Sequence, residues 1–199
     1  SPAVVASLVI PVFNKCELTH ACLLALQKHT PLQGIPFEVI VVDNASWDKT
    51  SELLHRFQEH PDLNLRVLRN AINLGFAKAS NQGALVARGS VVVFLNNDTE
   101  VHDGWLAPLV DELQQHSDTG CVGARLLFPN GTIQHAGVAI GRTSIPYHVH
   151  LGKPADDPLV MERRAFPVVT GACLAVRREQ FVWLGMFDEE YVNGTEDID

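Results

Sequence analysis

Three polar residues follow three apolar runs of the sequence, and their side chains suit nucleotide or metal binding. Asn14, Asp43 and Asp98 come after the runs 4–12, 37–42 and 91–95. A carboxylate can accept the imide N–H of a uracil or thymine ring. It can also bind Mg²⁺ or Mn²⁺, which favour oxygen ligands. The alternative is that each aspartate only caps a turn or the next helix, and it weakens if the runs are neighbouring strands facing one crevice.

The apolar runs alternate with segments of helical spacing, which predicts an α/β fold with a mostly parallel central sheet flanked by helices. Ligands of such sheets bind beyond the carboxyl ends of the strands, where these three side chains fall. Asp48 is expected to be the N-cap of the second helix. The predicted strands are residues 4–12, 37–42, 65–68 and 90–95, and the predicted helices cover residues 17–29, 48–57, 79–85 and 104–116.

The pattern changes after about residue 119. Residues 122–128 and 132–140 are predicted to form a hairpin around residues 129–131, which read PNG, and residues 141–164 a long mobile loop. A strand over 168–176, interrupted at Gly171, and a helix over 178–184 follow. We expect one domain over residues 1–199, with a nucleotide-binding half of about 1–118 and a smaller mixed half of about 119–199. The chain stops at Asp199 after a fresh helix start, so we expect a longer protein to continue beyond it.

Composition excludes several classes of protein. Hydrophobic residues make up 46% and charged residues 19%, a globular balance, and no apolar stretch could span a bilayer. The net charge of −8, without a basic run, argues against nucleic acid as a partner. A diphosphate would then need a metal ion or backbone donors. The four cysteines lack the spacing of a zinc or redox motif, which predicts reduced fillers in a cytoplasmic protein, with a disulfide as the alternative.

The sequence also lacks the glycine motifs of two classes of nucleotide-binding protein. A dinucleotide-binding fold would place Gly-x-Gly-x-x-Gly in the turn after the first run, but residues 11–15 read PVFNK. The sequence also lacks the Gly-x-x-x-x-Gly-Lys-Ser/Thr phosphate loop. An NAD-dependent enzyme and a P-loop kinase are therefore poor interpretations.

Short motifs along nearly the whole chain carry a family resemblance. The chain resembles a family 2 glycosyltransferase with the GT-A fold, of the bacterial rhamnosyltransferase-like kind. This implies a Rossmann-like sheet with a smaller mixed acceptor-side region. The motifs are PVFN (11–14), VDNAS (42–46), NLGFA (73–77), LNNDT (95–99), DGWL (103–106), GTIQHAG (131–137), TGAC (170–173), FDE (187–189) and TED (195–197).

The resemblance also implies site residues. Asp98 corresponds to the metal-binding member of the family's Asp-x-Asp motif, which reads Asn96-Asn97-Asp98 here and so keeps one carboxylate. Asp197 corresponds to the catalytic base, with Glu196 beside it, and Asp43 to the residue that contacts the base of the nucleotide. The nucleotide-binding set is Pro11, Asn14, Asp43, Asn73, Gly75 and Asn97, and the acceptor-side set is Thr170, Gly171 and Ala172.

The implied activity is inverting, metal-dependent transfer of a hexosyl or rhamnosyl group from a UDP- or dTDP-sugar to a hydroxyl of a glycan or lipid-linked acceptor. Mg²⁺ or Mn²⁺ is the implied cofactor. The implied process is polysaccharide or cell-surface glycan assembly. The implied location is the cytoplasm, at the inner face of the membrane and in peripheral contact with it. The alternative is a catalytically silent sugar-nucleotide-binding or scaffolding domain, suggested by the incomplete metal motif.

Other aromatic and histidine residues are weaker candidates. Trp105 and Trp183 are expected to pack within helices, whereas Trp47 lies beside the nucleotide-side loop and is a candidate for ligand contact. His148 and His150 have the spacing of a metal pair, but an exposed or acceptor-facing role is the stronger interpretation. His135 lies in a family motif, and it is interpreted either as a core or turn histidine or as a ligand.

Overall fold

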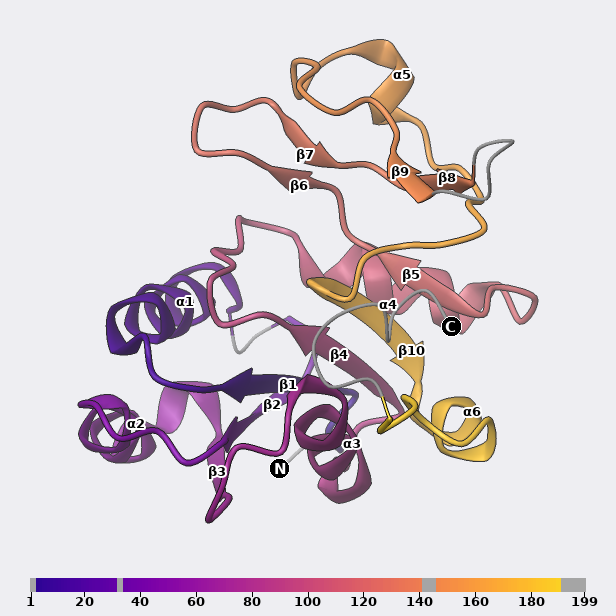
Figure 1. Ribbon diagram of the computed structural model, residues 1–199. Helices are drawn as coiled ribbons and strands as arrows, with labels where there is room; N and C mark the ends of the chain where they lie inside the picture. Colours follow the sequence, from indigo (N-terminus) through magenta and orange to yellow (C-terminus); the bar gives the residue numbers. More distant parts are fainter. Residues whose placement is uncertain (1–2, 32–33, 141–145, 191–199) are drawn as a thin grey trace.

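The computed structural model describes residues 3–31, 34–140 and 146–190, and its centre is one six-stranded mixed sheet (Figure 1). Its strand order is β3-β2-β1-β4-β10-β5. The first four strands are parallel, and β10 runs antiparallel to both of its neighbours. The strands are β1 (Ala6–Val12), β2 (Phe37–Asp43), β3 (Leu65–Arg69), β4 (Val91–Leu95), β5 (Cys121–Gly123) and β10 (Cys173–Arg177).

Helices cover both faces of the sheet, and each face has its own apolar core. Along β1, Leu8 and Ile10 face one core, whereas Val9 between them faces the other, as the two-residue period of a strand requires. The first core packs against α1 (Cys16–His29), α2 (Thr50–Gln58) and α4 (Leu106–Gln115). The second packs against α3 (Phe76–Val86) and α6 (Arg178–Trp183). The predicted α/β architecture is therefore confirmed.

A glycine allows α3 to approach the sheet closely. A β-carbon built on Gly83 would lie 2.3 Å from Cγ1 of Val9, so any side chain there would collide with β1. The close approach places the N-terminus of α3, at Gly75, beside the carboxyl ends of β1 and β2. Part of the edge at the carboxyl ends of the parallel strands is therefore built by helix packing.

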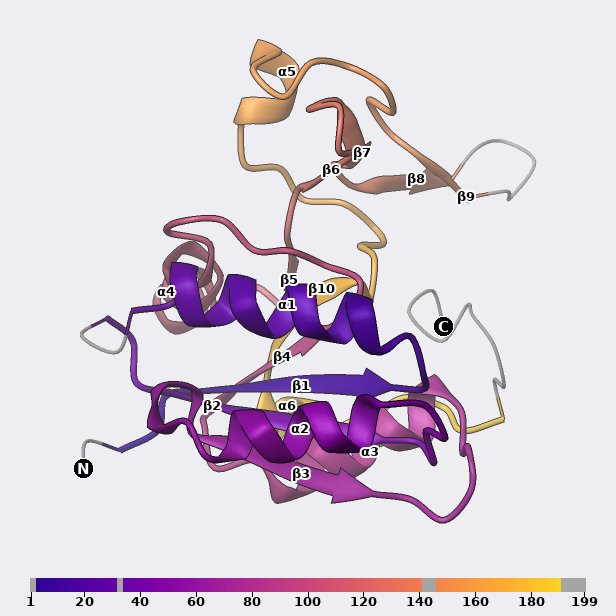
Figure 2. The same ribbon diagram turned by 90° about the vertical axis from the view of Figure 1, so that its left-hand side faces the viewer.

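A second layer, which we call the small lobe, comprises residues 126–140 and 146–168 and stands apart from the sheet in both ribbon views (Figures 1 and 2). We call the sheet and the helices that cover it the main layer. The 3₁₀ turn Pro61–Leu63 belongs to it, because Leu63 is buried in the first core. Few residues form the core of the small lobe, with Ile133, Val138 and Val160 buried. Its elements are β6 (Leu126–Leu127), β7 (Ile133–His135), β8 (Val138–Ile140), β9 (Pro146–His148) and α5 (Pro158–Met161).

The predicted hairpin of residues 122–128 and 132–140 is only partly correct. β6 pairs with β7 around the predicted turn, but β5 pairs with β10 in the main sheet. The second arm also breaks at Gly137, whose φ of +113° is a left-handed conformation that ends the ladder. Phe166 occupies the space that a β-carbon on Gly137 would need. The segment expected to form one hairpin thus contributes β5 to the main sheet, β6 and β7 to a second sheet, and β8 to a third.

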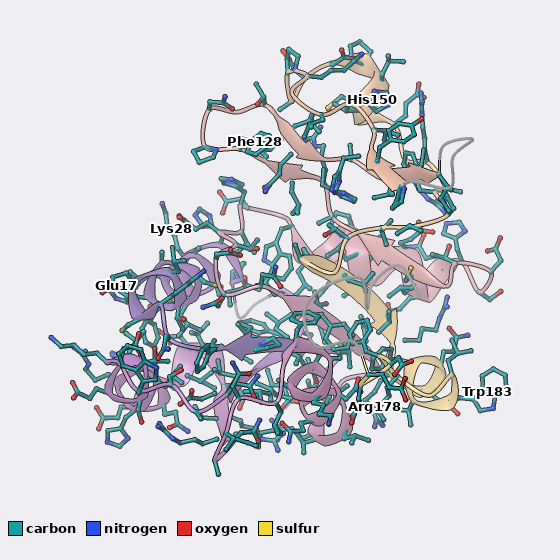
Figure 3. All side chains as sticks on the ribbon, in the orientation of Figure 1. Glu17, Lys28, Phe128, His150, Arg178 and Trp183 are labelled. Atoms are coloured by element: carbon teal, nitrogen blue, oxygen red, sulfur yellow. The ribbon has the colours of Figure 1, made fainter. Side chains whose placement is uncertain are left out.

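Three smaller expectations also need correction. The segment expected to be a long loop contains β9 and α5, although residues 141–145 lie outside the described residues. Trp183 is 80% exposed and points away from α6 into solvent (Figure 3), so it does not pack within the fold. Lys49, not Asp48, occupies the N-cap position of α2. Among the described residues, no helix has the length and apolar character needed to cross a bilayer.

Candidate functional site

Asp43 is the most buried of the predicted ligand-binding carboxylates, with 1% of its surface exposed. Its Oδ1 accepts a hydrogen bond of 2.8 Å from the backbone N–H of Ser46. Its Oδ2 lies 2.9 Å from Nη1 of Arg69, an ion pair without the alignment of a hydrogen bond. Oδ2 therefore keeps hydrogen-bonding capacity that the described residues do not use. A buried acceptor of this kind calls for a partner, and a ligand can be that partner.

Arg69 is a site residue that the sequence interpretation missed. It is the register partner of Asp43 at the end of β3, so the two side chains meet across neighbouring parallel strands. Its Nη2 also donates to the backbone O of Ser46 at 2.8 Å. The only sequence signal was a charged residue at the end of a predicted strand, because the pairing of β2 with β3 could not be known.

The loops after β1 and β2 are held together by hydrogen bonds between them. Asn14 and Lys15 adopt left-handed conformations, with φ of 55° and 56°, and these turn the chain sharply into α1. The backbone N–H of Asn14 donates to Oγ of Ser46 at 2.8 Å, and its Oδ1 accepts from the N–H of Trp47 at 2.9 Å. The side chain of Asn14 thus shapes this edge, while Trp47 is left 81% exposed above it.

Asp48 extends this connection between the two loops. Its carboxylate accepts from the N–H of Cys16 at 3.0 Å and from the N–H of Thr50 at 2.9 Å. Burial alone would raise the pKa of Asp48, but these hydrogen bonds lower it below its ordinary value. Asp48 therefore joins the first turns of α1 and α2, although Lys49 is the N-cap residue of α2.

A buried asparagine positions the loop after β3. Nδ2 of Asn44 donates to the backbone O of Gly75 at 3.0 Å, and its Oδ1 accepts from Nδ2 of Asn70 at 2.8 Å. Asn73 accepts the N–H of Gly75 at 2.9 Å. The predicted residues Asn73 and Gly75 thus lie at the same edge as Asp43, and Asn44 is the missed residue that holds them there.

Pro11 lies in β1, in register with Val42 of β2.

The predicted metal-binding residues lie in the loop after β4. Nδ2 of Asn97 donates to Oγ1 of Thr19 in α1 at 2.9 Å, which fixes the loop against that helix. Asp98 is exposed, whereas Cys22 is buried beneath the loop. Burial, together with the charges of Asp98 and Glu100, raises the pKa of the Cys22 thiol to about 12. Cys22 is therefore a neutral packing residue. All four cysteines are free, and Cys121 is exposed rather than a packing residue as predicted.

The donor set at this loop fits a hard divalent cation only in part. Asp98 offers an exposed carboxylate, and the Asn97 carbonyl oxygen is a second oxygen donor because only its Nδ2 bonds to Thr19. Within the described ranges, no group of three His, Cys, Asp or Glu residues could hold a metal. A cation bound here would need further oxygen ligands from its substrate.

The predicted acceptor-side residues lie directly beside the Asn96–Asp98 loop. The backbone N–H of Asn96 donates to the O of Ala172 at 3.0 Å, and Leu95 pairs with Cys173 across β4 and β10. Thr170 accepts the N–H of Ala172 through its Oγ1 at 3.3 Å. The structure thus places the residues 170–172 next to the predicted metal loop. Glu196 and Asp197 lie outside the described residues.

Asn81 connects α3 to the segment before those residues. Its Nδ2 donates to the O of Phe187 at 2.9 Å and to Oε1 of Glu189 at 3.1 Å. Its Oδ1 accepts the N–H of Phe187 at 3.1 Å. The motif around residues 187–189 is therefore held against α3, on the side of the sheet opposite to α1.

Comparisons with known proteins identify the family and the fold of the chain. The sequence model of the family "Glycosyl transferase family 2" matches residues 7–181. The O-antigen biosynthesis protein RfbC of Myxococcus xanthus is 34% identical over 192 residues, which cover 93% of this chain and 15% of that protein. This chain therefore spans a small part of that relative's length.

Two solved structures share the fold. The mannosyltransferase PcManGT of Pyrobaculum calidifontis, in complex with GDP-Man and Mn²⁺, superposes with a TM-score of 0.67 at 22% identity, over 99% of this chain and 53% of that one. GalNAc-T7 with UDP, GalNAc and Mn²⁺ superposes with a TM-score of 0.75 at 22% identity, over 98% and 39%. The fold is that of GT-A glycosyltransferases, and by the extent of the sequence match the chain belongs to glycosyl transferase family 2.

Proposed function

We propose that the chain carries the catalytic domain of an inverting glycosyltransferase, which moves a sugar from a nucleotide-diphosphate sugar to a hydroxyl acceptor. The observation that carries this proposal is the half-satisfied, buried carboxylate of Asp43 at the edge where the Asp98 loop also lies. Residues 1–118 would bind the donor and residues 119–199 would face the acceptor, within one domain.

Asp43 would select the base of the donor. Its ionised carboxylate only accepts hydrogen bonds, and Oδ2 has capacity to accept one more. The imide N–H of uracil or thymine is a matching donor, which favours UDP- or dTDP-sugars. Guanine also carries N–H donors, and the relative from Pyrobaculum calidifontis was solved with GDP-Man, so GDP belongs in any binding test.

Asp98, with Asn97, would hold Mg²⁺ or Mn²⁺ together with the diphosphate of the donor. The cation would neutralise the charge that builds on the leaving diphosphate. Asn97 remains tied to Thr19 and keeps the loop in place. Because the protein offers few ligands, metal and nucleotide should each bind weakly without the other.

The acceptor hydroxyl would lose its proton to Asp197, with Glu196 beside it, as it attacks the anomeric carbon opposite to the diphosphate. Attack from that face inverts the configuration. Thr170, Gly171 and Ala172 would line the acceptor side. A hexosyl or rhamnosyl group is the proposed cargo, and a glycan or lipid-linked acceptor in cell-surface polysaccharide assembly is the proposed partner, as the O-antigen relative suggests.

The four free cysteines favour a reducing compartment, which supports a cytoplasmic location. A peripheral contact with the inner face of the membrane would bring the site to a lipid-linked acceptor.

Calorimetric titration with UDP, dTDP and GDP, with Mn²⁺ or with a chelator, tests the proposal. Mn²⁺ should strengthen binding of one nucleotide by a factor on the order of 5 to 150, and the nucleotide must strengthen Mn²⁺ binding equally. Asp98→Ala should remove the metal effect and leave metal-free binding through Asp43 largely intact. Glu100→Ala, an exposed carboxylate two residues along, is the matched control and should bind as wild type.

The second candidate, a catalytically silent sugar-nucleotide-binding domain, is favoured by the amides at positions 96 and 97. A full-length protein that binds nucleotide with Mn²⁺ but neither transfers sugar nor hydrolyses donor would support it. Absence of nucleotide binding in every condition would contradict both candidates.

A further inference from the structure

His135 lies at the end of β7 in the small lobe, with 2% of its surface exposed, and no step of the proposed reaction uses it. Its Nε2 faces two backbone donors, the N–H of Gly137 at 3.2 Å and the N–H of Thr170 at 3.4 Å. The first lies in the turn between β7 and β8, and the second belongs to the acceptor-side segment. One imidazole nitrogen thus joins two segments that are 33 residues apart.

The second ring nitrogen of His135 determines its tautomer. Because Nε2 accepts from two N–H groups, we assign the ring proton to Nδ1. Nδ1 lies 2.9 Å from Nδ1 of His148 on β9, which then accepts that proton. The two rings meet edge to face, with centroids 5.1 Å apart. His148 therefore holds His135 in the form that can accept from Thr170.

The attachment of the small lobe to the sheet depends on few contacts. Leu126 packs against the first core, and Arg163 forms an ion pair with Glu112 of α4. In addition, His135 accepts from Thr170. The small lobe otherwise exposes large apolar side chains, such as Tyr147, Leu151 and Met161, rather than packing them against the main layer. Each contact therefore has a large share in fixing the orientation of the lobe.

The contact through His135 continues to the predicted metal loop. Thr170 is followed by Gly171 and Ala172, and the O of Ala172 accepts the N–H of Asn96 at 3.0 Å. The next two residues after Asn96 are Asn97 and Asp98. Residues 170–172 thus connect His135 to the loop that carries Asp98, with a hydrogen bond at each end of the segment.

We propose that His135 is a positioning residue, which holds the segment 170–172 between the small lobe and the Asp98 loop and so orients the acceptor side relative to the donor. This inference rests on the proposed function. It predicts that loss of the Nε2 acceptor lowers turnover without weakening nucleotide binding. Asp43 lies outside this set of contacts, and the hydrogen bond from Asn97 to Thr19 holds the Asp98 loop independently of His135. A misplacement of about 1 Å can reduce rate by a factor on the order of 100.

Two variants and one control separate positioning from simple stabilisation. His135→Leu removes the acceptor, whereas His135→Gln supplies Oε1 near the position of Nε2. Ile133→Ala is the control. Ile133 is fully buried in the same strand, but its apolar side chain cannot accept a hydrogen bond from Thr170. All three would be made in the full-length protein and compared for kcat, for UDP affinity with Mn²⁺, and for amide exchange of the peptide that contains Thr170.

We expect His135→Leu to lower kcat by about 10- to 100-fold, to speed exchange at Thr170 and to leave nucleotide affinity within about threefold. His135→Gln should restore most of the kcat, and Ile133→Ala should lower thermal stability while keeping kcat. Wild-type kcat in His135→Leu, or an equal loss of kcat in Ile133→Ala, would overturn the proposal. A wild-type protein without nucleotide binding would instead contradict the proposed function, and unchanged exchange in His135→Leu would still refute the contact to Thr170.

Discussion

Strand β2 carries a buried carboxylate at each end, and the two are satisfied very differently. Glu38, near the amino end, is fully buried and accepts from Ser7 Oγ, from the backbone N–H and Nε of Arg88, and from Nη1 of Arg66, at 2.8 to 3.2 Å. Asp43, at the carboxyl end, accepts one backbone hydrogen bond and forms one ion pair. Both of its partners lie on loops or at strand ends.

The difference supports a structural role for Glu38 and the proposed binding role for Asp43. A buried carboxylate whose oxygens are all engaged has nothing left to offer a ligand, and its role is to hold neighbouring elements together. Glu38 does this for β1, β3 and the turn after α3. Asp43 retains an unused acceptor at the edge where ligands of parallel sheets bind. The two residues should therefore respond to substitution in opposite ways.

The largest expected effect is on stability at the amino end. Glu38→Ala removes the shared acceptor of several donors, and we expect the free energy of unfolding to fall by about 3 kcal/mol. This is the low end of the range for a broken buried pair, because both arginines are partly exposed and can be hydrated. Urea denaturation measures this loss, and Glu52→Ala, at an exposed position of α2, is the control. A loss below about 1 kcal/mol would contradict the structural role.

The second expected effect is on binding at the carboxyl end. Asp43→Asn keeps an oxygen that can accept from Ser46 but removes the charge and the unused acceptor Oδ2. A hydrogen bond to a charged group is worth about 1.5–3 kcal/mol, so nucleotide affinity should fall by about 10- to 100-fold. Calorimetry with UDP and dTDP measures it. Glu38→Gln, in the same strand, should bind nucleotide as wild type, and equal weakening in both variants would erase the contrast.

The smallest expected effect is on the pH dependence of stability. Burial alone would raise the pKa of Glu38, but hydrogen bonds from Arg88, Ser7 and Arg66 lower it below its ordinary value. The stability from the ionised carboxylate is therefore fully present above about pH 4.3, the ordinary pKa of glutamate, and is lost as pH falls through the lowered pKa. Thermal melts of wild type and Glu38→Gln from pH 7 to pH 3 measure it.

The difference in melting temperature between wild type and Glu38→Gln should be constant from pH 7 to about pH 5 and should narrow at lower pH. A difference that widened on acidification would mean that folding raises the pKa of Glu38 instead of lowering it.

Much of the main sheet could be predicted from the sequence because its signals are local. The apolar runs and helical spacings predicted β1 to β4 and α1 to α4 within a few residues. Asn14 and Asp98 follow the carboxyl ends of β1 and β4 and Asp43 ends β2, with β1 lying between the other two strands. A period of two or of 3.6 residues is visible within one element and does not depend on its neighbours.

Only the tertiary structure decided which side chains meet. The ion pair of Asp43 with Arg69 depends on the pairing of β2 with β3, and the contact of His135 with Thr170 joins residues 35 positions apart. The hairpin prediction was wrong for β5, which pairs with β10, and for β8, which pairs with β9. Trp183 is exposed. Strand partners and helix neighbours set these outcomes. Sequence periodicity reports which face of an element is apolar, whereas the partner of that face is chosen by packing of the whole chain.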